Sequence, residues 1–386
     1  MRTVIRPPLA TCALLEASPL LEPRRALRVR LVWLTWTPTR PLSATLALLA
    51  ATTPLPALRH ARCARMRVLR NQYRSRKRLL IDDQVAIYHI VTRTTCQQFL
   101  FGPEEREVFC NLLMKQAGFS GVEVLSYCVM SNHVHLLLQI NPDAKPSDPE
   151  MLRRYENYYG TEKVPLSAYS VSELKAILTE GGPTADKERA RVLARMNDLP
   201  AFMRELKQRF SIWYNHKHEN TGTIWSARYK SLIVENSPET LTRVAAYIDL
   251  NPIRAGIVTD PKDYRWCSYS AGLAGQPRAR KALIQLFHGK REYKQAIAAY
   301  RLILFGKGYQ SKGVEHKDRG TISAERLEEV IQQNGHVPIN ELLRVRIRYF
   351  SDGMALGSKA FIQQVFENNR DEFGINRKRA GARLPS

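Results

Sequence analysis

The segment that most constrains the fold is 131–138, in which two histidines alternate with apolar residues. It reads Ser-Asn-His-Val-His-Leu-Leu-Leu and is suited to a buried strand. Side chains two residues apart leave the same face of a strand, so His133 and His135 point one way while Val134 and Leu136 point the other way. The apolar side predicts burial in a core, and the histidine side offers two imidazoles to one divalent cation. Two ligands do not complete a metal site, so further donors must come from elsewhere in the chain.

The composition predicts a soluble protein with a polyanionic partner. The chain has 386 residues, 44% hydrophobic and 25% charged, which allows two or three ordinary globular domains. Its net charge of +23 favours nucleic acid or an anionic membrane surface as the partner. The six cysteines include no CxxC pair, which argues against a zinc ribbon and against a disulfide framework. This cysteine usage suits a reducing compartment, and we expect a cytoplasmic protein.

Residues 1–65 differ in composition from the rest of the chain. They contain ten arginines, two glutamates, eight prolines and no lysine or aspartate. Apolar runs such as 42–51 are too short to span a bilayer and are bounded by prolines, so no membrane segment is expected. The segment is either an organellar transit peptide or an over-extended start that precedes Met66, and we favour the second. We expect it to be poorly ordered.

From Met66 onward, the pattern of apolar runs and breakers predicts an α+β domain. Pro103 and Gly118 delimit one helix, and the 131–138 strand pairs antiparallel with the strand before it. When the insertion at 141–198 is left out, the predicted elements follow the order strand, helix, strand, strand, helix, strand, helix. This order is typical of a ferredoxin-like split β-α-β fold with an antiparallel sheet. The expected elements are the strand 85–91, the helix 103–117, the strands 122–129 and 131–138, the helix 199–218, the strand 224–234 and a helix from Ser237 to Leu250 or Asn251.

We expect three parts after the leader. Residues 66–275 form the catalytic domain, and 141–198 is an insertion with helical pieces at 150–159, 170–179 and 184–196. Residues 276–386 form a helical, basic region. Its later helices, 323–334, 339–348 and 358–368, are either a tri-helical DNA-binding module or an appendage that packs on the catalytic domain.

The helix that begins after Ser237 carries the second half of the chemistry. Tyr247 and Asn251 are four residues apart and therefore share one helical face. A phenol can act as a nucleophile toward phosphorus, and an amide oxygen is a hard ligand for Mg²⁺ or Mn²⁺. Beside His133 and His135, this face would suit a metal-assisted phosphoryl transfer through a covalent phosphotyrosine.

These motifs together resemble a known family. The segments 88–93, 130–138, 247–256 and 266–269 are similar to those of the REP-associated tyrosine transposases, which belong to the single-tyrosine branch of the HUH endonuclease superfamily. The resemblance covers roughly 80–275, with a looser likeness to about 370. It implies a divalent-metal-dependent nuclease and strand transferase that acts on single-stranded DNA folded into hairpins.

The resemblance assigns roles to four residues. His133 and His135 match the metal-binding pair, Tyr247 matches the nucleophile, and Asn251 falls where related transposases use an amide ligand. The chain departs from the family in its long 141–198 insertion and in having Asp249, which the pattern does not require.

Several residues have a second interpretation. Asn251 can instead cap the end of its helix before Pro252. His89 is expected to be a packed strand histidine, and His216 and His218 are expected to contact DNA or solvent. The weaker candidates for the nucleophile are Tyr214 and Tyr229.

Cationic residues that flank the motifs are candidates for binding DNA phosphates. They are Arg74, Arg76, Lys77, Arg78, Arg209, Lys217, Arg228, Lys230 and Arg254. The aromatic residues Trp213, Tyr214 and Trp225 could stack on unpaired bases.

The sequence therefore predicts a transposase that cleaves and rejoins hairpin or single-stranded DNA as a monomer or homodimer. One alternative is a domesticated protein that binds DNA hairpins with little or no catalysis. A replication or mobilisation initiator of the wider superfamily is less favoured, because such proteins commonly carry large partner domains that this chain lacks.

Overall fold

In the part of the chain that the structure describes, five strands form one sheet in the order β2-β3-β1-β4-β5. The computed structural model describes residues 84–160, 168–305, 350 and 353–373, which belong to the unit Ala61–Ser386. The first four strands pair antiparallel, and β5 is parallel to β4. This is the ferredoxin-like order with one added edge strand, so the predicted α+β class is confirmed. The strands are β1 (Ala86–Arg93), β2 (Glu123–Val129), β3 (His133–Ile140), β4 (Lys230–Val234) and β5 (Ala355–Leu356).

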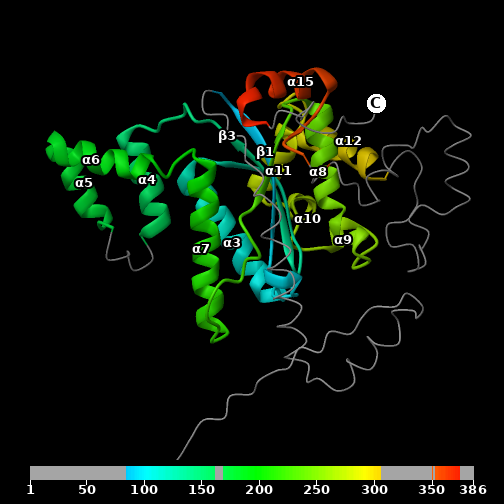
Figure 1. Ribbon diagram of the computed structural model, residues 1–386, viewed down its shortest axis with the longest axis horizontal. Helices are drawn as coiled ribbons and strands as arrows, with labels where there is room; N and C mark the ends of the chain where they lie inside the picture. The colour runs from blue at the N-terminus through cyan, green and yellow to red at the C-terminus, as the bar shows by residue number, and fades with distance from the viewer. Residues whose placement is uncertain (1–83, 161–167, 306–349, 351–352, 374–386) are drawn as a thin grey trace, which may run out of the picture. The chain divides into compact units, whose positions relative to one another are not determined.

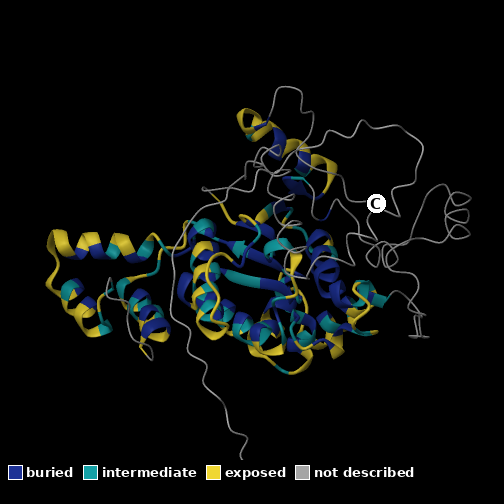
Figure 2. Cartoon of the chain, turned by 60° about the horizontal axis from the view of Figure 1, so that its bottom comes forward, coloured by how far each residue is buried: buried dark blue, intermediate teal, exposed yellow. Residues whose placement is uncertain are grey.

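Helices cover both faces of the sheet (Figure 1). The helices α3 (Pro103–Ser120) and α7 (Leu199–Lys217) pack on the face that carries Val134 and Leu136. The opposite face packs against α8 (Pro238–Asp249) and the helices that follow it. Figure 2 shows the strands largely buried between these layers, with the exposed sides of the helices turned outward.

Further helices follow α8 in the chain. As far as residue 305, they are α9 (Asn251–Arg254), α10 (Ser268–Leu273), α11 (Pro277–Gln285) and α12 (Tyr293–Phe305). Short 3-10 turns lie at Thr95–Gln97, Pro261–Asp263 and Arg370–Glu372.

Local sequence signals explain where α8 begins. The Ser237 hydroxyl accepts a hydrogen bond from the Thr240 N–H at 3.3 Å, and Pro238 occupies the first turn, as predicted. The helix α8 ends at Asp249, one or two residues before the predicted end at Leu250 or Asn251. A separate helical turn, α9, then starts at Asn251, where Pro252 lies in the first turn and its missing N–H costs no hydrogen bond.

Two other predicted boundaries are corrected. The helix α3 continues through Gly118 and ends at Gly121, whose φ of +78° is the left-handed conformation that glycine adopts readily. The strand predicted at 224–234 is regular only from Lys230, although Trp225 forms an isolated bridge to Thr94.

The insertion contains three helices close to the predicted positions. They are α4 (Asp148–Tyr159), α5 (Val171–Glu180) and α6 (Gly182–Leu193). They bury a separate apolar cluster that includes Tyr155 and Tyr158 and reaches the main domain at Phe119 of α3. The insertion is therefore a helical subdomain docked on α3.

The described C-terminal residues pack on the sheet domain. Tyr300 and Leu304 of α12 belong to the same apolar cluster as α8. Strand β5 extends the sheet, and α15 (Lys359–Asn368) packs on the α3 and α7 side. This arrangement favours the packed appendage for 353–373. The other two helices expected for a tri-helical module, 323–334 and 339–348, lie outside the described residues, as does the leader 1–65.

The described cysteines differ in state. Cys110, Cys128 and Cys267 are free, whereas Cys96 is disulfide-bonded, which the cysteine usage did not lead us to expect. Within the described ranges, no helix has both the length and the apolar composition required to cross a membrane.

Asp249 fastens the end of α8 to α12 and α10 through hydrogen bonds. Its carboxylate is buried and accepts hydrogen bonds from the Tyr300 hydroxyl at 2.6 Å and from the Tyr269 N–H at 3.3 Å. Burial raises the pKa of Asp249 to about 7, although these hydrogen bonds oppose the shift. The residue that the family pattern did not require is therefore a packing residue of α8.

We predict that Asp249→Asn makes the protein less sensitive to pH. Because the pKa of Asp249 is raised in the folded state, its contribution to stability is complete below about pH 4 and is lost as pH rises toward 7, at up to roughly 1.4 kcal/mol per pH unit. The asparagine variant lacks this loss, so its stability relative to wild type should increase from pH 5 to pH 7. Denaturant unfolding at several pH values measures the difference. Asp263→Asn, at an exposed position, is the matched control, and an equal pH trend in both variants would contradict the assignment.

Candidate active site

The histidine pair lies at the start of β3. The register with β1 places His133 opposite Arg93 and His135 opposite Val91, so these side chains leave one face of the sheet. The two imidazole centroids lie 5.1 Å apart with the rings nearly perpendicular. His135 is buried and His133 is partly exposed. His133 and His135 therefore share one face of the sheet, as their spacing in the sequence predicted.

A third histidine lies beside the pair. His89 of β1 is completely buried on the same sheet face, and its ring stacks on that of His135 at 5.2 Å. Its Nε2 lies 2.9 Å from His135 Nδ1, and its Nδ1 lies 2.8 Å from the carbonyl oxygen of Phe350. His89 is packed, as the sequence predicted, but the sequence did not indicate its bond to a candidate metal ligand.

Burial favours the neutral form of the two inner histidines. Desolvation lowers the pKa of His89 to about 4, although the hydrogen bond to the Phe350 carbonyl opposes the shift. Desolvation also lowers the pKa of His135 well below its usual value, and the neighbouring histidines and arginines add to the effect. Neutral imidazole is the form that binds a metal ion, so His135 has the appropriate charge state at neutral pH.

Tyr247 projects from α8 toward the histidines. Its ring lies edge-on to His135 at 5.9 Å and to His89 at 6.1 Å. Phe350 stacks on the ring at 4.4 Å, and the guanidinium of Arg254 lies 4.1 Å from the ring centroid. Two groups this close cannot share a face of the ring, so Tyr247 is held between them and is only 4% exposed.

The two weaker candidates for the nucleophile lie elsewhere. Tyr214 of α7 and Tyr229 belong to the apolar cluster on the opposite face of the sheet from the histidines. Neither can share a site with His135 without crossing the sheet. Tyr247 is therefore the candidate that fits the histidine face.

Asn251 occupies the junction between α8 and α9. Its Nδ2 donates to the carbonyl oxygens of Tyr247 at 3.3 Å and Ile248 at 3.0 Å. This is the helix-capping role that the sequence left open beside the role of metal ligand. Both hydrogen bonds use the amide nitrogen, which leaves Oδ1 as the atom suited to a cation. The ligand role stays a prediction.

Three cationic residues surround this face. Arg254 donates through Nη2 to the carbonyl oxygen of Tyr247 at 2.5 Å, and Lys230 of β4 lies opposite Val91 and shares the histidine face. Arg93, opposite His133, was not among the predicted site residues. The sequence contained a signal for Arg93, because it is four residues after His89 on one strand and therefore shares the face of His89.

The remaining predicted DNA-binding residues lie in other surroundings. The guanidinium of Arg209 covers the Tyr158 ring of the insertion at 4.2 Å, and Lys217 pairs with Glu104 and Glu105. Arg228 is exposed in the segment before β4. Residues Arg74, Arg76, Lys77 and Arg78 lie outside the described part of the chain.

The three aromatic candidates for base stacking differ in exposure. Trp225 is buried among core aromatic rings, and its Nε1 donates to the Ser211 hydroxyl at 2.9 Å. Tyr214 is also buried, and its ring lies 4.3 Å from that of His218. Trp213 is partly exposed beneath Lys217. Of the three, only Trp213 retains accessible surface of a useful size.

The donor set for a divalent cation is uncharged. Among the described residues, no group of three or more histidine, cysteine, aspartate or glutamate side chains could hold a metal ion. The candidate set is instead the two imidazoles of His133 and His135 with the Asn251 amide. Imidazole and amide oxygen are chemically suitable for Mn²⁺ and Mg²⁺, so the residues fit a cation whose remaining ligands come from water and phosphate.

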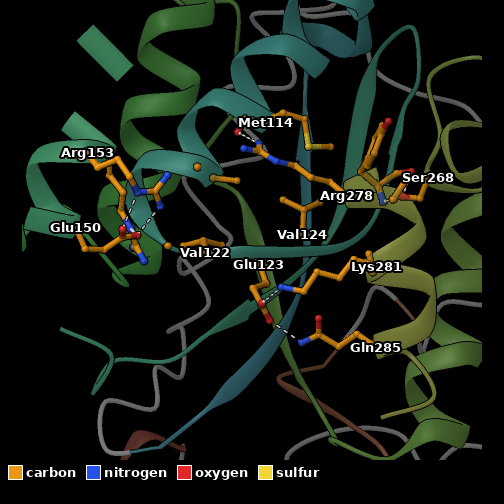
Figure 3. Close-up of a pocket in the computed structure, with 17 residues that line it drawn as sticks. Met114, Val122, Glu123, Val124, Glu150, Arg153, Ser268, Arg278, Lys281 and Gln285 are labelled. Carbon is orange, nitrogen blue, oxygen red and sulfur yellow. Dashed lines mark hydrogen bonds and ion pairs between the residues drawn. The ribbon is translucent and has the colours of Figure 1, made fainter. Parts of the chain in front are cut away.

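A separate pocket of about 250 Å³ lies at the β2 edge of the sheet (Figure 3). It is lined by residues of α3, β2, α4, α10 and α11, and none of the predicted site residues lines it. Its polar groups largely satisfy one another: Gln285 donates to Glu123 at 2.6 Å, and Arg278 donates to the carbonyl oxygen of Met114 at 2.7 Å. The pocket is therefore distinct from the histidine face.

Comparisons with known proteins agree with the sequence motifs. No curated protein matches the chain. A solved structure entitled "Structure of the REP associates tyrosine transposase bound to a REP hairpin" matches with a TM-score of 0.32 and 14% identity, over 53% of this chain and 87% of that chain. Residues 84–155 match the family model described as "Transposase IS200 like". This segment, which contains β1, α3, β2 and the histidine strand β3, is similar to the IS200-like transposases, which supports the resemblance to the tyrosine transposases that the sequence motifs indicated.

Proposed function

We propose that the protein is a single-tyrosine transposase that cleaves and rejoins single-stranded DNA. The observation that carries the proposal is the position of Tyr247, whose ring meets His135 and His89 on one face of the sheet. A phenol beside candidate metal ligands and arginines suits attack on a phosphodiester.

In the proposed reaction, the Tyr247 oxygen forms a bond to phosphorus while the bond from phosphorus to the 3′-oxygen breaks. The products are a 5′-phosphotyrosine and a DNA end with a 3′-hydroxyl. The phenol proton passes to solvent water as the new bond forms, and the departing 3′-oxygen takes a proton from solvent water. Rejoining is the reverse attack by a 3′-hydroxyl on the phosphotyrosine, so no external energy source is required.

The residues around Tyr247 have separate tasks in this proposal. Arg254 holds the tyrosine through its main-chain carbonyl and covers the ring, so that the phenol stays on the histidine face. Arg93 and Lys230, on the same face, would bind the phosphate charge that develops during attack. His133, His135 and Asn251 would hold Mg²⁺ or Mn²⁺, which when bound supplies a Lewis acid for the phosphate oxygens.

Hairpin DNA is the substrate class that the sequence resemblance implies. The net charge of +23 supports a polyanionic partner. The exposed cations Lys230 and Arg228 and the partly exposed Trp213 are candidate contacts to the strand.

The burial of Tyr247 favours a second candidate function. With 4% exposure and a ring held between Phe350 and Arg254, the tyrosine of this conformation has little access to a phosphate. A protein that binds hairpins without cleaving them would keep this packing. The two functions differ in one observable, the formation of a covalent protein–DNA adduct.

We predict that Tyr247→Phe abolishes the adduct. A labelled hairpin oligonucleotide incubated with Mn²⁺ and wild-type protein should yield a species that survives denaturing electrophoresis. The phenylalanine variant keeps the ring packing but lacks the nucleophilic oxygen, so it should yield no adduct and bind the hairpin as tightly as wild type. Tyr229→Phe, on the opposite sheet face, should react like wild type. An adduct in the Tyr247→Phe protein would overturn the assignment, and hairpin binding without an adduct in wild type would favour the second function.

We predict that His133→Ala weakens Mn²⁺ binding by at least about 100-fold, because one of few protein ligands is removed. His133 is partly exposed, so the substitution should change thermal stability little. The loss of the electron paramagnetic resonance signal of free Mn²⁺ measures binding, with and without the hairpin. Chelation of the metal should stop adduct formation in wild type. Unchanged Mn²⁺ affinity in the variant would exclude His133 as a ligand.

We predict that Asn251→Ala lowers both stability and Mn²⁺ affinity. Loss of the two hydrogen bonds from Nδ2 should cost about 1 kcal/mol of stability. Loss of Oδ1 should weaken Mn²⁺ binding roughly tenfold, on the scale of changes around a metal site. If stability falls while the affinity stays at the wild-type value, Asn251 is a helix cap only.

A further inference from the structure

The starting observation is a continuous chain of hydrogen bonds that ends on a candidate metal ligand. It runs from the carbonyl oxygen of Phe350 to His89 Nδ1 at 2.8 Å, and from His89 Nε2 to His135 Nδ1 at 2.9 Å. The sequence separation between Phe350 and His89 is 261 residues, so two distant parts of the chain meet here. The rings of the two histidines stack nearly parallel, with an interplanar angle of 19°.

The chemistry of these groups fixes the direction of each hydrogen bond. A main-chain carbonyl oxygen can only accept, so His89 must carry its proton on Nδ1. His89 is completely buried, which favours the neutral ring with a single N–H. Its Nε2 therefore accepts, and His135 must donate from Nδ1. The lone pair of His135 is then on Nε2, the only ring nitrogen left for a metal ion.

We propose that His89 is a positioning residue that holds His135 in the tautomer and ring orientation required to bind the divalent cation. The proposal rests on the metal site of the proposed function and adds to it His89, which accepts a hydrogen bond from the candidate ligand His135. Metal-ligating histidines generally donate their second N–H to an acceptor that sets the tautomer and the ring plane, and here a buried imidazole takes that place. The acceptor is itself oriented by the Phe350 carbonyl.

The proposal also gives the C-terminal segment a part in the site. Phe350 orients His89 through its carbonyl oxygen and stacks on Tyr247 through its ring. One residue thus contacts both the support of the metal ligand and the proposed nucleophile. Position 350 lies just before β5, which fastens the segment to β4 at the edge of the sheet.

Two substitutions of His89 separate positioning from packing. In His89→Gln, the side-chain amide can still donate to the carbonyl and accept from His135, because it carries both functions. In His89→Phe, the ring volume is kept but His135 loses its acceptor. Leu137→Val is the matched control, since Leu137 lies directly opposite His89 on β3 and is buried without a polar role.

The test combines Mn²⁺ titration with the ¹⁵N spectrum of labelled histidine side chains. In wild type, His135 should give the shifts of the Nδ1–H tautomer. In His89→Phe, His135 should change toward the Nε2–H tautomer, and Mn²⁺ affinity should fall about 10- to 100-fold. His89→Gln should retain the wild-type tautomer and bind within about threefold of wild type, and Leu137→Val should change neither property.

Each other result overturns an identified step. An Nε2–H tautomer of His135 in wild type rules out the hydrogen-bond direction, even if the variants fail to fold. Wild-type Mn²⁺ affinity in His89→Phe rules out positioning, and equal losses in His89→Gln, His89→Phe and Leu137→Val would reduce His89 to a packing residue. A wild-type protein that binds no Mn²⁺, with or without the hairpin, overturns the metal site and therefore the proposed function. The ¹⁵N spectrum of the same protein separates this outcome from a failure of the further inference, because the spectrum reports the His135 tautomer without any metal ion.

Discussion

The antiparallel register between β1 and β3 is the constraint on which the site depends. It aligns His89, Val91 and Arg93 of one strand with Leu137, His135 and His133 of the other, so that all six share a face. Because side chains alternate with a period of two, a slip of one residue would turn the histidines into the apolar layer under α3 and α7. Such a slip would bury the imidazoles of His133 and His135 among the apolar side chains of that layer, where a polar group without a hydrogen-bond partner is costly. The core therefore determines the position of the candidate metal ligands His133 and His135.

Helix α8 brings Tyr247, the proposed nucleophile, to this face because both of its ends are anchored. Ser237 caps its start, and Asp249 ties its end to the Tyr300 hydroxyl and to the Tyr269 main chain. Tyr247 lies two residues before Asp249, roughly 200° around the helix, and its ring meets His135 and His89 of the sheet. A carboxylate is costly to bury, but the hydrogen bonds to Asp249 hold it and fix the end of the helix.

Much of this could be predicted from local sequence, and the exceptions have a common cause. The strand spacing placed His133 and His135 on one face, and the capping signals located α8, because both depend on neighbouring residues only. The role of Asn251 stayed open, because one amide can both cap a helix and bind a cation. Trp225 was expected to stack on bases, but core aromatic rings bury it. Phe350 was not identified, because no periodicity relates it to His89 or Tyr247.

Phe350 links the candidate site to the C-terminal part of the described fold. The strands β1 and β3 and the helix α8 bring His135 and Tyr247 together, and Arg254 covers one face of the tyrosine ring. Phe350 supplies the acceptor for His89 Nδ1 and stacks on the tyrosine ring, and its segment joins the sheet through the two-residue edge strand β5. The segment is held by main-chain hydrogen bonds to β4 and by the burial of Phe350 and Leu356. Because Phe350 contacts both His89 and Tyr247, the orientation of the candidate metal ligand His135 and the packing of the proposed nucleophile depend on the same part of the chain.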